Sequence, residues 1–234
     1  MRTSELAVVS ALGFVVAVMV AFGVWIRLIA EPIPELSGER TSRTYDLSGF
    51  DGVDTSGQWE VTIERGDVSR VAVEMPVELV DEVEVVVRGD RLSLGFGQGW
   101  CPTGCFRDDV ELQATITMPA LESLDSSGAS TISFSGFEGG TLSLDVSGAG
   151  RLRGTASRFD RLMLDMSGAA EIDLGEVPVT DAEVDISGAG NVDLSMAGGR
   201  LSGDISGAAN LEYSGTVSAE TIDRSGMVNV RRRD

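Results

Sequence analysis

The chain has 234 residues, enough for one large domain with an appended segment or for two small domains. Its 18 Lys and Arg residues face 37 Asp and Glu residues, a formal net charge of −19, and this acidic surface disfavours nucleic acid because phosphates are repelled. The absence of His excludes imidazole-based triads and His metal sites. Any catalysis would therefore rest on carboxylates, Ser, Tyr, Arg or the two Cys.

The N-terminal segment predicts a membrane anchor. Residues 6–26, LAVVSALGFVVAVMVAFGVWI, carry no charge, and at about 1.5 Å per residue this run matches the roughly 30 Å core of a bilayer. A cleaved signal peptide is the alternative, although its apolar region is typically only about 7–15 residues long. Arg2 precedes the span, and the positive-inside rule then places the bulk of the chain outside the cytoplasm.

These features predict a single-pass protein of the cytoplasmic (inner) membrane with its main domain on the periplasmic or extracellular side. Residues 1–30 form the transmembrane anchor, which contacts the membrane through residues 6–26. Residues 31–43 contain EPIPEL, a sequence that favours a short, stiff, Pro-containing linker. Residues 44–234 form the main domain.

Between residues 44 and 120 the sequence predicts strands without a regular period. Alternating apolar and polar residues occur in VTIERGD from Val61, VEVVVRGDRLSLGF from Val83 and VELQATITMP from Val110. No linker-like composition separates these stretches from the residues that follow. We therefore expect irregular turns or hairpins of one continuous domain.

Two cysteines lie close together in this part of the chain. Cys101 and Cys105 flank a Pro/Gly turn in GWCPTGCF, and outside the cytoplasm such a pair predicts a small structural disulfide. Free thiols and a redox-active pair are the alternatives, although the usual redox spacing is C-x-x-C. Zinc binding would need two further ligands, and the chain has no His and no other Cys.

From residue 125 onward the sequence repeats. Each unit has Asp two residues before a Ser-Gly pair and an aliphatic residue five positions after the Ser. The Ser residues stand at intervals of 20, 20, 20, 19 and 19 positions: Ser127, Ser147, Ser167, Ser187, Ser206 and Ser225. An earlier copy is aligned by Ser56. A fixed period near twenty residues indicates a repeat architecture.

Within each unit apolar and polar residues alternate, which is typical of half-buried strands, and the Ser-Gly pair supplies a bend. Short strands of this kind cannot bury an apolar face alone. Stacked in parallel about 4.8 Å apart, they place like residues over like, with the aliphatics in internal columns and the Asp column outside. The sequence therefore predicts an all-β protein, a parallel β-helix with turns of about 20 residues.

The ordered motifs resemble a known family. YDLSGFDGVDTSGQWEVTIERGD (45–67), RGDRLSLGF (88–96), ITMPALESLDSSGAS (116–130) and the serial SGAG units are similar to the GIN domain, described as a putative auto-transporter adhesin head. The resemblance covers roughly residues 44–230. It implies a right-handed β-helix, a location outside the cytoplasm, and adhesion, and it supplies no catalytic residues.

The repeated carboxylates are the most conspicuous candidate site. Stacked side chains about 5 Å apart repel by about 0.8 kcal/mol per pair in bulk water, and an oxygen-rich ladder can attract Ca²⁺. The simpler interpretation is structural, with each Asp stabilising its own bend through a local side chain–backbone bond. We therefore predict no metal, cofactor or catalytic site. The acidic ladder, a weak cation-binding candidate, comprises Asp125, Asp145, Asp165, Asp185, Asp204 and Asp223.

Two groups of Arg allow two interpretations each. Arg151, Arg153, Arg158 and Arg161 could bind acidic sugars or pair with neighbouring acidic residues, and pairing is the favoured interpretation. The tail Arg231-Arg232-Arg233 could bind an anionic partner. Alternatively it guards the open end of the stack, because an exposed strand edge invites pairing with other chains.

Together these patterns predict a membrane-anchored, non-enzymatic binding or structural module, adhesin-like, with an unknown protein or glycan ligand and no nucleic-acid partner. The alternative is a carbohydrate-active β-helix enzyme, a polysaccharide lyase or glycosidase using carboxylates. Such an enzyme would need a unique cluster that breaks the repeat, for example two carboxylates about 5–9.5 Å apart in a groove.

Overall fold

The computed structural model describes residues 37–97 and 112–233. The predicted anchor at residues 6–26 and the predicted disulfide between Cys101 and Cys105 lie outside these residues. Among the residues that the structure describes, no helix is long and apolar enough to cross a membrane.

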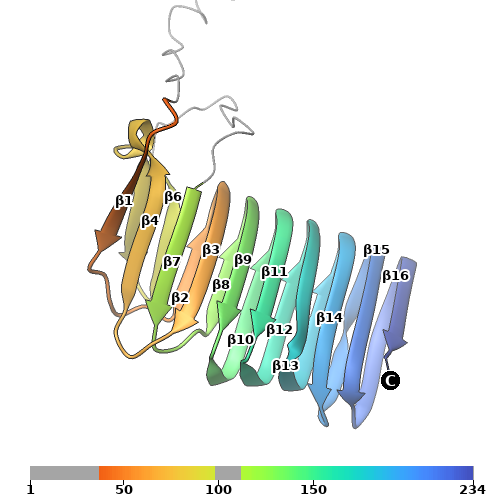
Figure 1. Ribbon diagram of the computed structural model, residues 1–234. Helices are drawn as coiled ribbons and strands as arrows, with labels where there is room; N and C mark the ends of the chain where they lie inside the picture. Colours follow the sequence, from red (N-terminus) through yellow and green to blue (C-terminus); the bar gives the residue numbers. More distant parts are fainter. Residues whose placement is uncertain (1–36, 98–111, 234) are drawn as a thin grey trace, which may run out of the picture. The chain divides into compact units, whose positions relative to one another are not determined.

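The strands wind into a β-solenoid of about six turns (Figure 1). Each turn has a first arm before the Ser-Gly corner and a second arm after it, and equivalent arms of successive turns pair in parallel. The parallel β-helix predicted from the repeat is therefore confirmed.

The strands divide between the two arms as follows. The first arms are β6 (Arg91–Phe96), β2 (Gly52–Thr55), β8 (Ser123–Ser126), β10 (Glu138–Val146) and β12 (Arg158–Met166). The second arms are β7 (Leu112–Met118), β3 (Gln58–Arg65), β9 (Ala129–Ser135), β11 (Ala149–Thr155) and β14 (Ala189–Ala197). Three long strands contribute to both arms because they run on through a corner: β13 (Ala169–Ile186), β15 (Arg200–Thr216) and β16 (Ala219–Arg232).

Equivalent residues of successive turns lie directly over one another. Leu152 pairs in register with Ile132 on one side and Ile172 on the other, and Ile172 pairs with Val192. All four side chains are buried. The predicted internal column of aliphatic residues is thus confirmed, and its burial favours the stacked state by about 25 cal/mol per Å² of apolar surface.

The corner glycines are required by close backbone contact between turns. A Cβ atom on Gly148 would lie 1.8 Å from the carbonyl oxygen of Gly128, and one on Gly168 would lie 1.7 Å from that of Gly148. The Ala that follows each Gly donates its backbone N–H to the preceding turn, as Ala149 does to Gly128 over 2.9 Å. Glycine therefore lets successive corners stack at strand spacing.

The irregular strands before the repeat cover the N-terminal end of the stack. The turn formed by β2 and β3 lies between the turn of β6 and β7 and the turn of β8 and β9. Beyond β7 lie β4 (Arg70–Pro76) and then β1 (Arg40–Tyr45), both antiparallel to their neighbours. These strands belong to the same compact unit as the repeats.

The remaining N-terminal elements are a 3₁₀ turn, η1 (Val77–Leu79), and β5 (Val83–Arg88). β5 forms an antiparallel hairpin with β6; the sequence left irregular turns and hairpins open for this stretch. β1 begins at Arg40, so strand structure includes residues 40–43, which the sequence assigned to the linker.

At the opposite end of the described stack, β16 is the outermost strand and pairs with β15. Its register places Glu220 over the buried Leu201, Arg224 over Ile205 and Arg232 over Tyr213. Charged side chains thus occupy three positions that continue inward columns. Arg224 lies 3.0 Å from a carboxylate oxygen of Glu220, so an ion pair covers this end of the apolar interior.

Candidate functional site

The Asp residues of the repeat form a column on the outer face of the first arms. The strand register stacks them turn upon turn, and Asp54 extends the column toward the N-terminal end. We term this column the Asp ladder; its members are Asp54, Asp125, Asp145, Asp165, Asp185, Asp204 and Asp223. Adjacent strands lie about 4.8 Å apart, so neighbouring carboxylates repel one another.

One carboxylate of the ladder accepts a hydrogen bond from a backbone N–H group. Among the described residues, Oδ1 of Asp185 accepts a hydrogen bond of 3.0 Å from the backbone N–H of Asp204. This bond links two turns, whereas the sequence suggested that each Asp bonds within its own corner. It occurs where the repeat shortens from 20 to 19 residues, at a step where Gly203 adopts a φ of 144°.

The negative charge in the middle of the ladder is not neutralised by basic side chains of the described residues. No ion pair joins Asp145, Asp165 or Asp185 to a basic residue within the described part of the chain. Partial burial raises the pKa of Asp165, and the charges of Asp145 and Asp185 raise it further. The ladder therefore favours cationic or neutral groups over anionic ones.

At its N-terminal end the ladder is different, because Arg91 of β6 reaches over it. Nε of Arg91 lies 3.0 Å from Oδ1 of Asp54, and Nη1 donates to Oδ2 of Asp125. Burial raises the pKa of Asp125; Arg91 opposes this shift, and the nearby Asp54 adds to it. One guanidinium thus bridges carboxylates of two successive turns.

Beside the contacts of Arg91 with Asp54 and Asp125, the surface forms a groove of about 250 Å³. Every residue that lines the groove has a polar side chain, and each presents oxygen atoms for hydrogen bonding, either of a carboxylate or of a hydroxyl. The lining residues are Asp54, Thr55, Ser56, Ser93, Asp125, Ser126, Ser127, Asp145 and Ser147. We term this hollow the hydroxyl groove.

The hydroxyl groove lies where the repeat is broken. The inward position just before the corner Ser carries Val146, Met166 and Ile186 in later turns, and all three are buried. In the turns of β2 and β8 the same position carries Thr55 and Ser126, which are also buried, with 2% and 6% of their surface exposed, whereas the turn of β6 carries the buried Leu94. Small hydroxyl side chains thus replace bulky apolar ones, and the surface is concave at this place.

This site was missed from the sequence, although the signal was present. Thr55 and Ser126 are hydroxyl residues at a position that is apolar in Val146, Met166 and Ile186, and this break in the repeat was not used in the prediction. Arg91 could not be placed from the repeat, because β6 lies next to β2 through a pairing that the period does not encode. The site therefore combines Asp residues that the sequence predicted with Arg91, which it did not predict.

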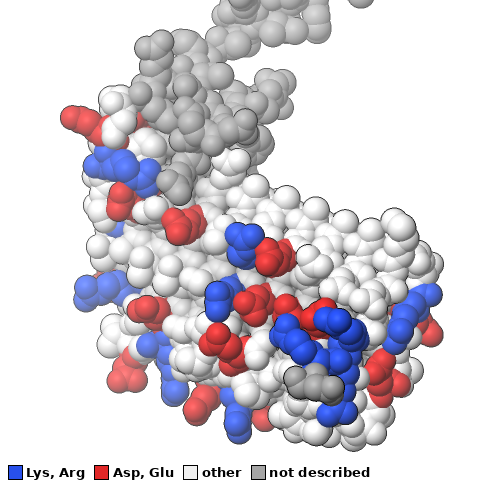
Figure 2. All heavy atoms as spheres, turned by 45° about the vertical axis from the view of Figure 1, so that its right-hand side comes forward, with Lys and Arg blue, Asp and Glu red and all other residues white. Residues whose placement is uncertain are grey.

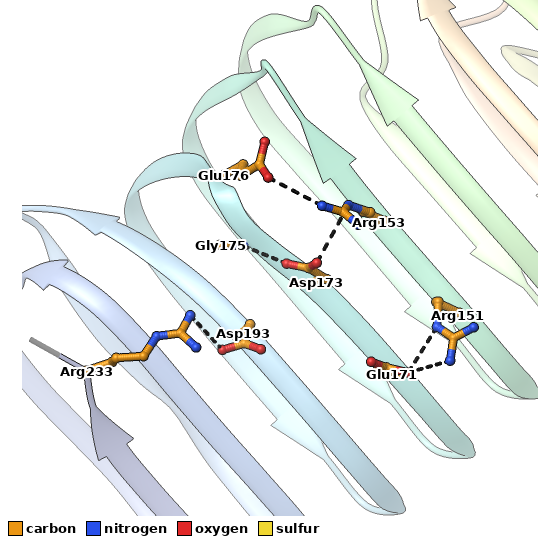
Figure 3. Close-up of polar contacts among 8 residues, drawn as sticks. All are labelled: Arg151, Arg153, Glu171, Asp173, Gly175, Glu176, Asp193 and Arg233. Carbon is orange, nitrogen blue, oxygen red and sulfur yellow. Dashed lines mark hydrogen bonds and ion pairs between the residues drawn. The ribbon is translucent and has the colours of Figure 1, made fainter.

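In the group Arg151, Arg153, Arg158 and Arg161, three residues pair with acidic residues of the following turn. Arg151 lies 2.7 Å from a carboxylate oxygen of Glu171, and Arg153 points between Asp173 and Glu176 at 3.7 and 3.3 Å (Figure 3). In the same way Arg161 lies 2.6 Å from Glu183. Pairing was the favoured interpretation, and the contacts of these three residues agree with it.

Basic and acidic side chains accordingly alternate over this surface and do not form a patch of one sign (Figure 2). The C-terminal Arg residues follow the same rule. Arg231 donates to Glu212 over 2.6 Å, and Arg233 lies 3.3 Å from Asp193. These two residues of the tail fold back onto preceding turns, and Figure 3 shows Arg233 pointing at Asp193.

Neither ladder nor groove presents a metal centre in the structure. Within residues 37–97 and 112–233, no group of three or more Asp, Glu, His or Cys side chains is arranged to hold a metal ion. The ladder places its carboxylates in a line, whereas Ca²⁺ needs about six to eight oxygens around one point.

The fold places this chain in the class of β-solenoid proteins with an apolar interior, and the groove lies on the outer surface of the solenoid. The chain belongs to the family described as "Putative auto-transporter adhesin, head GIN domain", which matches residues 49–176 and 163–234. The resemblance seen in the sequence is thereby confirmed. None of the curated proteins matches the chain.

Solved structures with the same fold include putative adhesins from three bacteria. One from Bacteroides fragilis NCTC 9343 is 15% identical with a TM-score of 0.66, over 84% of this chain and 98% of that chain. One from Parabacteroides merdae ATCC 43184 is 12% identical with a TM-score of 0.50, over 85% and 98%. One from Parabacteroides distasonis ATCC 8503 is 16% identical with a TM-score of 0.50, over 83% and 98%.

Proposed function

We propose that this protein is an adhesin-like binding module, anchored in the cytoplasmic membrane by residues 6–26, that acts outside the cytoplasm and is not an enzyme. The observation that carries the proposal is the match of the GIN family to residues 49–234, nearly the whole solenoid. Three solved proteins of the same fold are described as putative adhesins. At their low identities this likeness concerns the fold alone.

The architecture is suited to binding by surface contact. Apolar side chains fill the interior from Phe50 to Tyr213, so recognition falls on the outward columns of polar residues. Successive turns hold these columns at fixed spacing, which reduces the ordering entropy that a flexible surface would lose on binding. A protein or glycan partner is therefore met by a preorganised surface.

The carbohydrate-active enzyme remains the second candidate because one observation favours it. The hydroxyl groove does break the repeat, and it contains a pair of carboxylates, Asp54 and Asp125. A retaining or inverting glycosidase needs one free acid and one free base or nucleophile. Here both carboxylates contact the same Arg91 guanidinium, an arrangement that suits fixed hydrogen-bond acceptors better than proton transfer.

Binding and catalysis can be separated on the same samples. We expect the full-length protein in detergent micelles to bind an array of immobilised glycans and envelope proteins and to release no reducing sugar from those glycans. Release of reducing ends by the wild type, abolished in both Asp54→Asn and Asp125→Asn, would establish the enzyme instead. Absence of binding to every glycan and every protein would contradict the adhesin-like function.

The location is tested on isolated membranes and on unlysed spheroplasts. We expect the chain to remain with membranes after alkaline carbonate extraction, and its solenoid to be digested by protease added to spheroplasts without lysis. A soluble chain would show that residues 6–26 are cleaved or do not anchor. Protection of the solenoid until the cells are lysed would place it in the cytoplasm.

A further inference from the structure

We propose that the hydroxyl groove binds one non-anionic sugar unit, recognised by direct hydrogen bonds without a metal ion. This inference rests on the proposed binding function and adds to it a site and a ligand class. It is carried by a hydroxyl that opens into the groove without a partner among the described residues, by the chemistry of the groove lining, and by the volume of the groove.

Ser126 is the most informative residue of the groove. Only 6% of the residue is exposed, and its hydroxyl makes no hydrogen bond to any described residue. Its oxygen is not among the fully buried polar atoms that lack a partner, so it opens into the groove. A hydroxyl both donates and accepts hydrogen bonds, and the protein leaves this capacity of Ser126 unused. The residue lines the groove, so a group bound in the groove is the available partner.

The neighbouring turn shows that this hydroxyl is not needed to build the solenoid. Val146 occupies the equivalent position and is 5% exposed, so an apolar residue of larger volume fits the same inward column. Thr55, on the other side, is buried as well, and its hydroxyl donates over a long 3.4 Å to the Asp125 carbonyl. Two successive turns thus present hydroxyls where the stack would otherwise be apolar.

The lining selects the ligand by charge and by hydrogen-bonding character. Three carboxylates, Asp54, Asp125 and Asp145, accept hydrogen bonds, and the six Ser and Thr hydroxyls accept or donate them. Sugar hydroxyls are donors and acceptors and match this set. Uronate, sulfate and phosphate groups are disfavoured, because Arg91, the basic residue nearby, is already engaged by two of the carboxylates.

The size of the hollow limits what it holds. About 250 Å³ lies just below the range of roughly 300–1,000 Å³ typical of small-molecule pockets. The groove therefore accommodates one sugar unit, and the remainder of a glycan would extend over the exposed surface.

The test compares full-length wild type and Ser126→Val in detergent on an array of neutral-hexose, amino-sugar and uronate oligosaccharides. Ser126→Val installs the residue type of the next turn and fills the groove. We expect wild type to bind neutral or amino-sugar glycans in the presence of EDTA, and Ser126→Val to bind them at least tenfold more weakly. Its melting temperature should equal or exceed that of wild type, so that unfolding does not account for the loss.

Two further variants complete the design. Asp145→Asn should also weaken binding, because it removes a charged acceptor from the groove lining. Ser206→Ala removes a corner hydroxyl from a later turn, outside the groove, and should bind as wild type does. Equal loss in Ser206→Ala and Ser126→Val would overturn the assignment of the site.

The remaining outcomes are also decisive. Glycan binding that is unchanged in Ser126→Val would overturn the groove while leaving the adhesin-like function intact. Preference for uronate glycans, or binding that EDTA abolishes, would overturn the ligand class. Binding to envelope proteins but to no glycan would likewise overturn the sugar site and spare the proposed function.

Discussion

At the scale of single residues, the corner glycines and the Asp ladder respond to the same geometric constraint, the spacing of about 4.8 Å between turns. At Gly148 this spacing brings the backbone of one turn against that of the previous turn, so no side chain fits. At Asp165 it brings like charges together. The first effect is steric and the second is electrostatic, so they are separable by substitution.

We expect Gly148→Ala to lower the free energy of unfolding by about 1–3 kcal/mol, the usual result of overpacking. The added Cβ would meet the backbone oxygen of Gly128, which cannot move without displacing a whole corner. Urea denaturation followed by circular dichroism measures the change. Gly140→Ala is the matched control, since its Cβ would meet nothing within 4 Å. Equal effects of the two variants would contradict this explanation.

Asp165→Asn should stabilise the protein at neutral pH. Because folding raises the pKa of Asp165, its ionised form is disfavoured in the fold; stability falls as pH rises through the raised pKa and recovers on acidification. We expect a gain below about 1 kcal/mol near neutral pH and low salt. The gain should shrink in high salt and below about pH 3.8, the usual pKa, where both states are protonated.

Melting temperatures at two pH values and two salt concentrations test this expectation. Asp160→Asn, outside the ladder, serves as the control for loss of one charge. A lower melting temperature for Asp165→Asn near neutral pH, or a lower one for wild type after EDTA treatment, would show that a bound cation stabilises the ladder.

At the scale of elements, the regular turns could be predicted because each copy repeats the same alternation. The aliphatic column through Leu152 followed from the repeat, and the alternation in VEVVVRGDRLSLGF predicted strand structure for β5 and β6 without choosing between a turn of the solenoid and a hairpin. The order of the first turns did not, because β6 and β7 come after β2 and β3 in the chain but stack before them. Such pairing depends on contacts distant in sequence, and so did the contact of Arg91 with the ladder.

The last element, β16, shows how the stack ends. Glu220 accepts a hydrogen bond of 2.6 Å from the Tyr213 hydroxyl and pairs with Arg224. The hydrogen bond to Glu220 raises the pKa of Tyr213, and burial adds to the shift. Inward-pointing charges are a recognised protection of edge strands against pairing with other chains.

We therefore expect the double variant Glu220→Val, Arg224→Val to self-associate. Apolar side chains at both positions would continue the inward columns. The unpaired backbone groups of β16 could then form hydrogen bonds with a strand of another chain. Light scattering after size-exclusion chromatography should show a larger mass than wild type, rising with concentration. Replacing the pair Arg161 and Glu183 by Val removes the same charges in mid-stack and should leave the mass unchanged.

At the scale of the whole molecule, the two ends of the solenoid are closed by different means. Antiparallel strands β1, β4 and β5 cover the N-terminal end with further hydrogen bonds and buried residues such as Val71 and Val73. The C-terminal end depends on charged side chains, and in its last strand Ile222, Val228 and Val230 are only half-buried. Stability in a stacked repeat is approximately a sum over turns and their interfaces.

The C-terminal turn should therefore open before the rest. Native-state hydrogen exchange read by mass spectrometry is expected to show fastest exchange in peptides from β16, slower exchange in β15, and slowest exchange in the interior turns from β10 to β13. The covered N-terminal strands should exchange more slowly than β16. Uniform protection from β4 to β16 would mean that the solenoid unfolds as one cooperative unit. The C-terminal end would then be as stable against opening as the strand-covered N-terminal end.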